Sequence, residues 1–154
     1  ADAMKWLLSE KKFIDKNRCG VYGWSFGGFM SMSLMLKMPG LFKVGIAGGA
    51  VVDWRKYEVM YTERYMETPQ KNQEGFEEND LCNFADGLEG RLLMIHCDND
   101  PVVLWEHTLS FLKKAISSRK MVDYFVFPGH AHNVQGSDRV YLMRKILQYF
   151  NDFL

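Results

Sequence analysis

Residues 18–29 read Arg-Cys-Gly-Val-Tyr-Gly-Trp-Ser-Phe-Gly-Gly-Phe, an apolar run that passes through glycines into a helical pattern. The run 18–24 has the length and composition of a buried strand that ends in turn residues. Residues 26–38 place large apolar side chains at helical spacing, and Pro39-Gly40 ends that pattern. The stretch therefore predicts a strand, a tight turn at Gly23-Trp-Ser-Phe-Gly27, and a helix.

The rest of the chain repeats this alternation of strand and helix patterns. Three further buried strands are predicted at 42–48, 91–97 and 121–127, and further helices at 1–12, 103–118 and 138–154. The aromatic-rich stretch 53–66 is expected to be partly helical, and 67–90 is expected to be a polar surface excursion with short helical pieces. Alternating strands and helices predict an α/β fold, a three-layer sandwich with a mostly parallel sheet. We expect residues 1–154 to form one domain.

Composition narrows the classes of function. Hydrophobic residues make up 47% of the 154 residues, which is typical of a globular chain. The 19 basic residues balance the 19 acidic ones, so we expect neither nucleic acid nor an anionic membrane as the main partner. No run approaches the roughly 18 apolar residues of a membrane helix, and the first residues do not resemble a signal peptide.

The turn at residues 23–27 has the pattern G-x-S-x-G. Glycines on either side allow a cramped strand-to-helix turn that lifts the hydroxyl of Ser25 above the edge of the sheet. There a histidine can take its proton, and the backbone N–H of Phe26 can face a developing oxyanion. The alternative is a glycine-rich turn that only packs tightly.

Two more loops at the carboxyl ends of predicted strands carry candidate catalytic side chains. Asp98 and Asp100 follow strand 91–97, and His130 and His132 follow strand 121–127. The order serine, acid, histidine is the one that α/β-hydrolases use. Spacing alone leaves both aspartates and both histidines open. His96 and His107 fall within a strand and a helix, so we expect structural roles for them. The H-x-H spacing of His130 and His132 can suggest a metal site, but no Glu or third His follows at ligand spacing, so we expect no metal or other cofactor.

Three motifs resemble the prolyl oligopeptidase family, most closely its dipeptidyl-peptidase IV branch. Gly23-Trp-Ser-Phe-Gly-Gly-Phe29 is similar to G-W-S-Y-G-G-Y, residues 61–66 match Y-T-E-R-Y-M, and Leu93-Met-Ile-His96 with Asp100 is similar to the acid loop. The resemblance covers the whole chain as the C-terminal part of an α/β-hydrolase catalytic domain, from the nucleophile strand to the last helix. It implies that Ser25 is the nucleophile, Asp100 the acid and His132 the general base.

The same resemblance implies a pocket that accepts proline. Flat aromatic faces with few polar atoms suit a rigid pyrrolidine ring. The helical spacing of Trp54, Tyr57 and Tyr61 would equally suit a core. The positions that correspond to the wall of the pocket are Phe26, Val51, Trp54, Tyr57, Tyr61 and Val103. The implied activity is that of a serine peptidase that cleaves after proline and releases dipeptides or similar products. Val102 replaces the usual asparagine, which leaves the subsite preference open.

The resemblance carries further expectations and leaves alternatives. It implies earlier strands, a second oxyanion donor and a β-propeller outside this chain, and a periplasmic or extracellular location for the full-length protein. We therefore expect weak or no activity from the chain alone, and a dimer that covers the edge of strand 20–24. The alternatives are an acylaminoacyl-peptidase or esterase of the same fold, and a non-catalytic assembly module.

Overall fold

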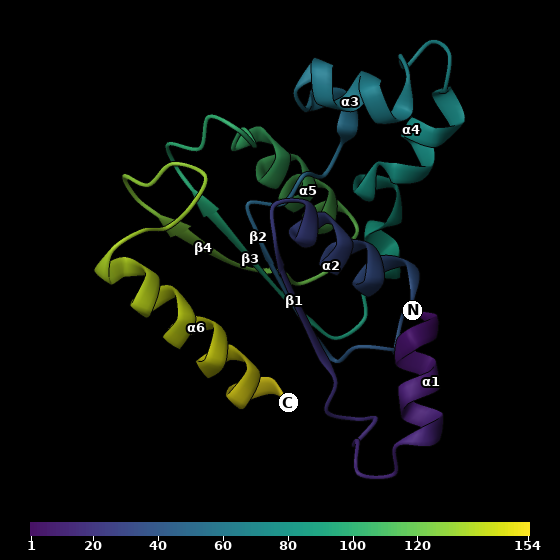
Figure 1. The fold of residues 1–154 in the computed structure, drawn as a ribbon, viewed down its shortest axis with the longest axis vertical. Helices are drawn as coiled ribbons and strands as arrows, with labels where there is room; N and C mark the ends of the chain where they lie inside the picture. Colours follow the sequence, from purple (N-terminus) through teal and green to yellow (C-terminus); the bar gives the residue numbers. More distant parts are fainter.

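Four parallel strands form one sheet in a computed structural model that describes residues 1–154 (Figure 1). They are β1 (Gly20–Trp24), β2 (Val44–Gly48), β3 (Arg91–Cys97) and β4 (Asp123–Phe127). The strands lie in the order β1-β2-β3-β4, and each pairs with the next strand along the chain. The carboxyl ends of all four strands therefore lie at the same end of the sheet. The loops after β1, β3 and β4 all leave the sheet at this end.

Helices account for most of the remaining chain. The α-helices are α1 (Asp2–Glu10), α2 (Phe26–Lys37), α3 (Val59–Met66), α4 (Gln73–Asn79), α5 (Glu106–Ser117) and α6 (Ser137–Phe153). Two short 3₁₀ helices are η1 (Trp54–Lys56) and η2 (Leu81–Gly87). The predicted α/β class with a parallel sheet is confirmed. None of these helices is both long enough and apolar enough to span a membrane.

The helices cover the sheet in two layers, which makes three layers in all. Because parallel strands joined in one direction need right-handed crossovers, all three connections between strands fall on the same face. The core on that face joins residues of α2, η2 and α5 to the sheet. On the opposite face, Leu142 and Ile146 of α6 pack against Val44, Ile46 and Leu93. Figure 1 shows α6 apart from the other helices, across the sheet.

Burial separates the two central strands from the two edge strands. Every residue of β2 is buried, as are six of the seven residues of β3, whereas β1 and β4 are mostly half-buried. Strands covered on both faces carry continuous apolar runs, which is why 91–97 could be recognised with its observed bounds. β1 pairs on one side only within this chain, so its other side is an open edge.

The segment 67–90 differs from the expected surface excursion. It does contain short helices, α4 and η2. However, Phe76, Leu81 and Ala85 are buried in the core between the sheet and the crossover helices. The segment is therefore part of the crossover layer, held by a few apolar side chains among many polar ones.

Candidate active site

Ser25 lies between β1 and α2 in a backbone conformation that residues other than glycine rarely adopt. Its φ is 60° and its ψ is −120°. Its N–H donates to the carbonyl oxygen of Gly48 at 2.8 Å, and its own carbonyl accepts the N–H of Phe29 at 3.0 Å. Such strain persists only where the surroundings hold it, and it is typical of a serine displayed at the end of a parallel strand.

The glycines around Ser25 are needed for close backbone contact, but not all to the same degree. A Cβ on Gly23 would lie 2.1 Å from the carbonyl oxygen of Gly27, and one on Gly28 would lie 2.7 Å from that of Gly48. A Cβ on Gly27 would meet nothing within 4 Å. The first glycine of the motif therefore makes room for the backbone of the second, and Gly28 lets α2 approach β2.

The carboxylate of Asp100 is buried and fully hydrogen-bonded. Oδ1 accepts the N–H groups of Val102 and Val103, each at 2.9 Å, and Oδ2 lies 2.7 Å from Nδ1 of His132. Burial acts to raise the pKa of Asp100. The hydrogen bonds from His132 and the two N–H groups outweigh burial, so this pKa lies below its ordinary value. The residue is therefore a carboxylate at neutral pH, directed at His132.

His132 is held at its backbone as well as at its ring. Its carbonyl oxygen accepts the indole N–H of Trp24 at 2.8 Å. Gly49, which has a φ of 47°, leaves room for the ring, since a Cβ there would lie 3.3 Å from Cε1 of His132. Trp24 precedes Ser25, and Gly49 follows the residue that binds the N–H of Ser25. These contacts bring His132 to the same end of β1 and β2 as Ser25.

The other two loop candidates have different partners. Nε2 of His130 lies 2.9 Å from Oδ2 of Asp138, at the start of α6. Oδ1 of Asp98 accepts the N–H of Gly129 at 2.6 Å and so ties the β3 loop to the β4 loop. Neither residue joins the Asp100–His132 pair. The structure therefore separates candidates that spacing could not.

His96 and His107 are both fully buried next to this site. Nδ1 of His107 accepts the N–H of Val52 at 3.1 Å, which anchors the loop after β2 to α5. Burial lowers the pKa of His107 to about 4, so its ring is neutral at pH 7. No group of three or more His, Cys, Asp or Glu side chains is arranged to hold a metal ion.

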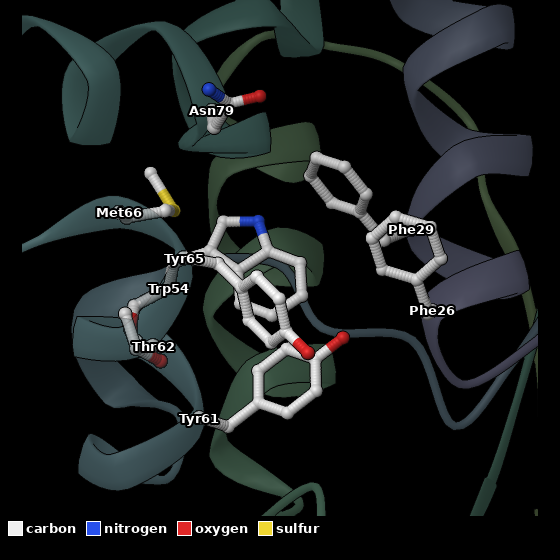
Figure 2. Close-up of a pocket in the computed structure, with 8 residues that line it drawn as sticks. All are labelled: Phe26, Phe29, Trp54, Tyr61, Thr62, Tyr65, Met66 and Asn79. Carbon is white, nitrogen blue, oxygen red and sulfur yellow. Dashed lines mark hydrogen bonds between the residues drawn. The ribbon is translucent and has the colours of Figure 1, made fainter.

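An aromatic cavity of about 530 Å³ opens beside Phe26, the residue after Ser25 (Figure 2). Phe26 and Phe29 of α2 line one side, and Trp54, Tyr61 and Tyr65 line the other. The ring centroids of Phe26 and Trp54 are 6.0 Å apart, and those of Phe29 and Trp54 are 5.2 Å apart. The cavity offers flat apolar surfaces to a ligand, with the amide of Asn79 at one end.

Three of the six expected pocket residues line this cavity, namely Phe26, Trp54 and Tyr61. Val51 and Val103 are buried in the core, and Tyr57 packs against Trp54 and Tyr61 with centroids 5.5 and 5.4 Å away. Five further residues that line the cavity were not predicted from the sequence, namely Phe29, Thr62, Tyr65, Met66 and Asn79. Tyr65 lies one helical turn after Tyr61, and this spacing was a signal that could have indicated Tyr65.

No single helix carries Trp54, Tyr57 and Tyr61. Trp54 belongs to η1, the chain then turns, and the carboxylate of Glu58 accepts the N–H groups of Met60 and Tyr61 at the start of α3. The hydroxyl of Thr62 donates to the carbonyl oxygen of Trp54 at 3.3 Å. The three rings therefore meet because these bonds fold α3 back over η1.

Arg55 fastens this wall of the cavity to the rest of the crossover layer. Its guanidinium donates to Oδ1 of Asp53 at 2.9 Å and also binds Asp80, at the start of η2. Hydrogen bonding to Asp53 raises the pKa of Arg55, so the guanidinium stays charged. Planar guanidinium groups suit such two-sided contacts.

The parallel sheet, the strained serine after β1 and the Asp–His pair after β3 and β4 define the class of the protein as an α/β-hydrolase fold. The sequence profile of the prolyl oligopeptidase family matches residues 1–154. The chain therefore belongs to the prolyl oligopeptidase family.

Its relatives within this family are dipeptidyl peptidases. It is 32% identical over 137 residues to dipeptidyl peptidase 8 of Mus musculus. The aligned part is 87% of this chain and 15% of the mouse protein. A Bacteroides ovatus structure assigned as a dipeptidyl aminopeptidase IV superposes with a TM-score of 0.97 at 50% identity. Porphyromonas gingivalis dipeptidyl peptidase 4 superposes with a TM-score of 0.94 at 29% identity. Each match covers 99% of this chain and 22% of the solved one.

Proposed function

We propose that this chain carries the catalytic triad of a serine peptidase, with Ser25 as nucleophile, His132 as general base and Asp100 as the orienting acid. The observation that carries the proposal is the 2.7 Å contact between Nδ1 of His132 and Oδ2 of buried Asp100. This contact leaves Nε2 of His132 to act on the hydroxyl of a serine at the same sheet edge.

The proposed reaction is acyl transfer. The oxygen of Ser25 attacks the carbonyl carbon of the scissile peptide bond, and His132 takes the hydroxyl proton and passes it to the leaving amine. The carboxylate of Asp100 stabilises the imidazolium that forms in between. The N–H of Phe26 lies in the first turn of α2, where N–H groups have no acceptor within their own helix, so it can bind the oxyanion.

We further propose that the residue before the scissile bond is proline, as in a peptidase that releases dipeptides. The aromatic cavity supports this, because it adjoins Phe26 and presents rings rather than charges. The names of the dipeptidyl peptidase relatives agree with the release of dipeptides and do not bear on proline. The chain spans 15% of the mouse relative, so the activity of the whole protein is part of the proposal.

Protection of Ser25 against a fluorophosphonate probe tests the substrate class even where turnover is slow. The labelling rate of the chain is measured with Gly-Pro, with Gly-Leu or with a short acyl ester present. We expect Gly-Pro to slow labelling most. Equal protection by Gly-Leu would overturn the preference for proline, and stronger protection by the ester would favour an esterase.

Val102 affects how the part of a substrate outside the aromatic cavity is bound. Val102 is 44% exposed and lines a hollow of about 320 Å³ together with His132. A valine there cannot donate a hydrogen bond to a substrate carbonyl, so we propose weaker selection for dipeptide length than in relatives with asparagine. We expect Val102→Asn to strengthen protection by Gly-Pro. Unchanged protection in this variant would contradict that role.

We also propose that the chain forms a dimer through the open edge of β1. An edge strand presents unpaired N–H and C=O groups, and Tyr22 on β1 is exposed. Light scattering after size-exclusion chromatography should give a dimer mass for the natural chain and a monomer mass for Tyr22→Lys. A monomer at all concentrations of the natural chain would contradict the proposal.

A further inference from the structure

The ring of His96 is fully buried, and both of its nitrogens are hydrogen-bonded. Nε2 lies 2.8 Å from the carbonyl oxygen of Val103, and Nδ1 lies 2.7 Å from the hydroxyl of Thr108 on α5. A carbonyl oxygen can only accept, so Nε2 carries the proton and donates a hydrogen bond to the carbonyl oxygen of Val103. In the neutral ring, Nδ1 then accepts a hydrogen bond from the hydroxyl of Thr108.

The turn that His96 holds is the turn that holds the proposed catalytic acid. Val103 receives the bond from His96 at its carbonyl and donates its own N–H to Oδ1 of Asp100 at 2.9 Å. Nε2 of His96 itself lies 3.6 Å from Oδ2 of Asp100. The chain of bonds therefore runs from Thr108 through His96 and Val103 to Asp100, and from there to His132.

We propose that His96 is a positioning residue, which aims the carboxylate of Asp100 at His132 by holding the carbonyl of Val103. This inference rests on the proposed function for its effect on catalysis. The loop between β3 and α5 has no regular structure of its own beyond turns. Backbone hydrogen bonds, such as the one from the N–H of Asp100 to the carbonyl oxygen of Cys97, fix only part of this loop. His96, near the end of β3, adds a side-chain tie to Val103 in the loop and to Thr108 on α5.

The charge state of His96 suits this role. Burial lowers the pKa of His96, so the ring next to Asp100 is neutral at pH 7. A neutral ring leaves the negative charge of Asp100 to be balanced by His132. A buried polar ring also costs stability unless it is hydrogen-bonded, so simple filling of this space would be served better by an apolar side chain.

Three variants separate the hydrogen bond from the space that the ring fills. His96→Gln keeps a donor that can reach Val103, because the glutamine amide nitrogen takes the place of Nε2. His96→Leu fills similar space without a donor. Thr108→Val leaves His96 in place and removes only the hydroxyl that binds Nδ1. All three are studied in the whole 154-residue chain.

The first readout is the downfield proton resonance of the bond between His132 Nδ1 and Asp100, measured by NMR without any substrate. We expect this resonance to be present in the natural chain and in His96→Gln. We expect it to be shifted or broadened in Thr108→Val and to be lost in His96→Leu. The second readout is the rate of fluorophosphonate labelling at Ser25. We expect it to fall roughly tenfold to a hundredfold in His96→Leu and less than about threefold in His96→Gln.

Retention of both the resonance and the labelling rate in Thr108→Val and His96→Leu would overturn the inference. A loss in His96→Gln as large as in His96→Leu would also overturn it, since the donor would then not matter. If His96→Leu does not fold, Thr108→Val and His96→Gln decide. If the natural chain shows the resonance but is labelled no faster than His132→Ala, the proposed function is refuted and the positioning role of His96 stands.

Discussion

Nδ1 of His132 lies 2.7 Å from Oδ2 of Asp100, and the other oxygen of that carboxylate accepts two backbone N–H groups. Four bonds or contacts thus fix one buried carboxylate relative to one histidine, counting the 3.6 Å approach of His96. Buried charges are tolerated when they are satisfied in this way. The pair is preorganised before any substrate arrives.

Asp100→Asn should lower the rate of fluorophosphonate labelling at Ser25 by about four orders of magnitude, the size of effect seen when a triad acid becomes an amide. The amide would favour the wrong tautomer of His132. Asp98→Asn is the matched control, because Asp98 binds only the N–H of Gly129 and keeps an acceptor as asparagine. An equal loss in the control would contradict the assignment of the acid to Asp100.

Much of the sheet could be predicted from the chain, because buried parallel strands are continuous apolar runs. β3 has the predicted bounds, and β1, β2 and β4 are each about two residues shorter at their amino ends than expected. The segment 67–90 was harder, since Phe76, Leu81 and Ala85 lie scattered among polar residues without a helical period.

The site, like the sheet, could be predicted from the sequence only in part. Chain order and strand ends indicated which loops carry the reactive side chains, but not which histidine reaches the acid. The indole of Trp24 binds the carbonyl oxygen of His132, and Gly49 leaves room for the ring of His132. Asp138 binds His130 instead. The cavity wall depends on how α3 folds back over η1, a tertiary contact with no local signal.

The free energy of unfolding should fall between pH 7 and pH 5, with His107 as a main cause. Burial lowers the pKa of His107 to about 4 in the folded chain, from an ordinary value of 6.5. Below pH 6.5 the unfolded chain binds this proton and the folded chain does not, so stability is lost as pH falls towards 4. The expected loss by pH 5 is about 2 kcal/mol.

His107→Asn is the control for this loss. The asparagine oxygen can replace Nδ1 as acceptor for the N–H of Val52, and it does not titrate. Urea unfolding at both pH values should therefore show a smaller difference in His107→Asn than in the natural chain. Equal differences in the two proteins would show that His107 does not carry the effect.

Gly23→Ala and Gly27→Ala should have opposite effects on stability. A Cβ at Gly23 would lie 2.1 Å from a backbone oxygen and force the serine turn to move, at a cost of about 1–3 kcal/mol or more. A Cβ at Gly27 meets nothing within 4 Å, and alanine in a helix is favoured over glycine by about 1 kcal/mol. Urea unfolding measures both. A destabilised Gly27→Ala would contradict the geometry of the turn.

Trp24→Phe should slow labelling at Ser25 about tenfold while changing stability by only about 1 kcal/mol. Phenylalanine keeps a ring against Gly48 but cannot donate to the carbonyl of His132. Labelling kinetics and thermal unfolding are measured on the same preparation. A natural labelling rate in Trp24→Phe would show that the indole bond does not position the histidine loop.

The central claim is that Ser25 is a nucleophile activated by His132. Its most direct test is intact-mass analysis of the natural chain, Ser25→Ala and His132→Ala after exposure to a fluorophosphonate probe. We expect one adduct on the natural chain, none on Ser25→Ala, and a rate lower by orders of magnitude in His132→Ala. An adduct of equal yield on Ser25→Ala, or equal labelling rates in the natural chain and His132→Ala, would contradict the claim.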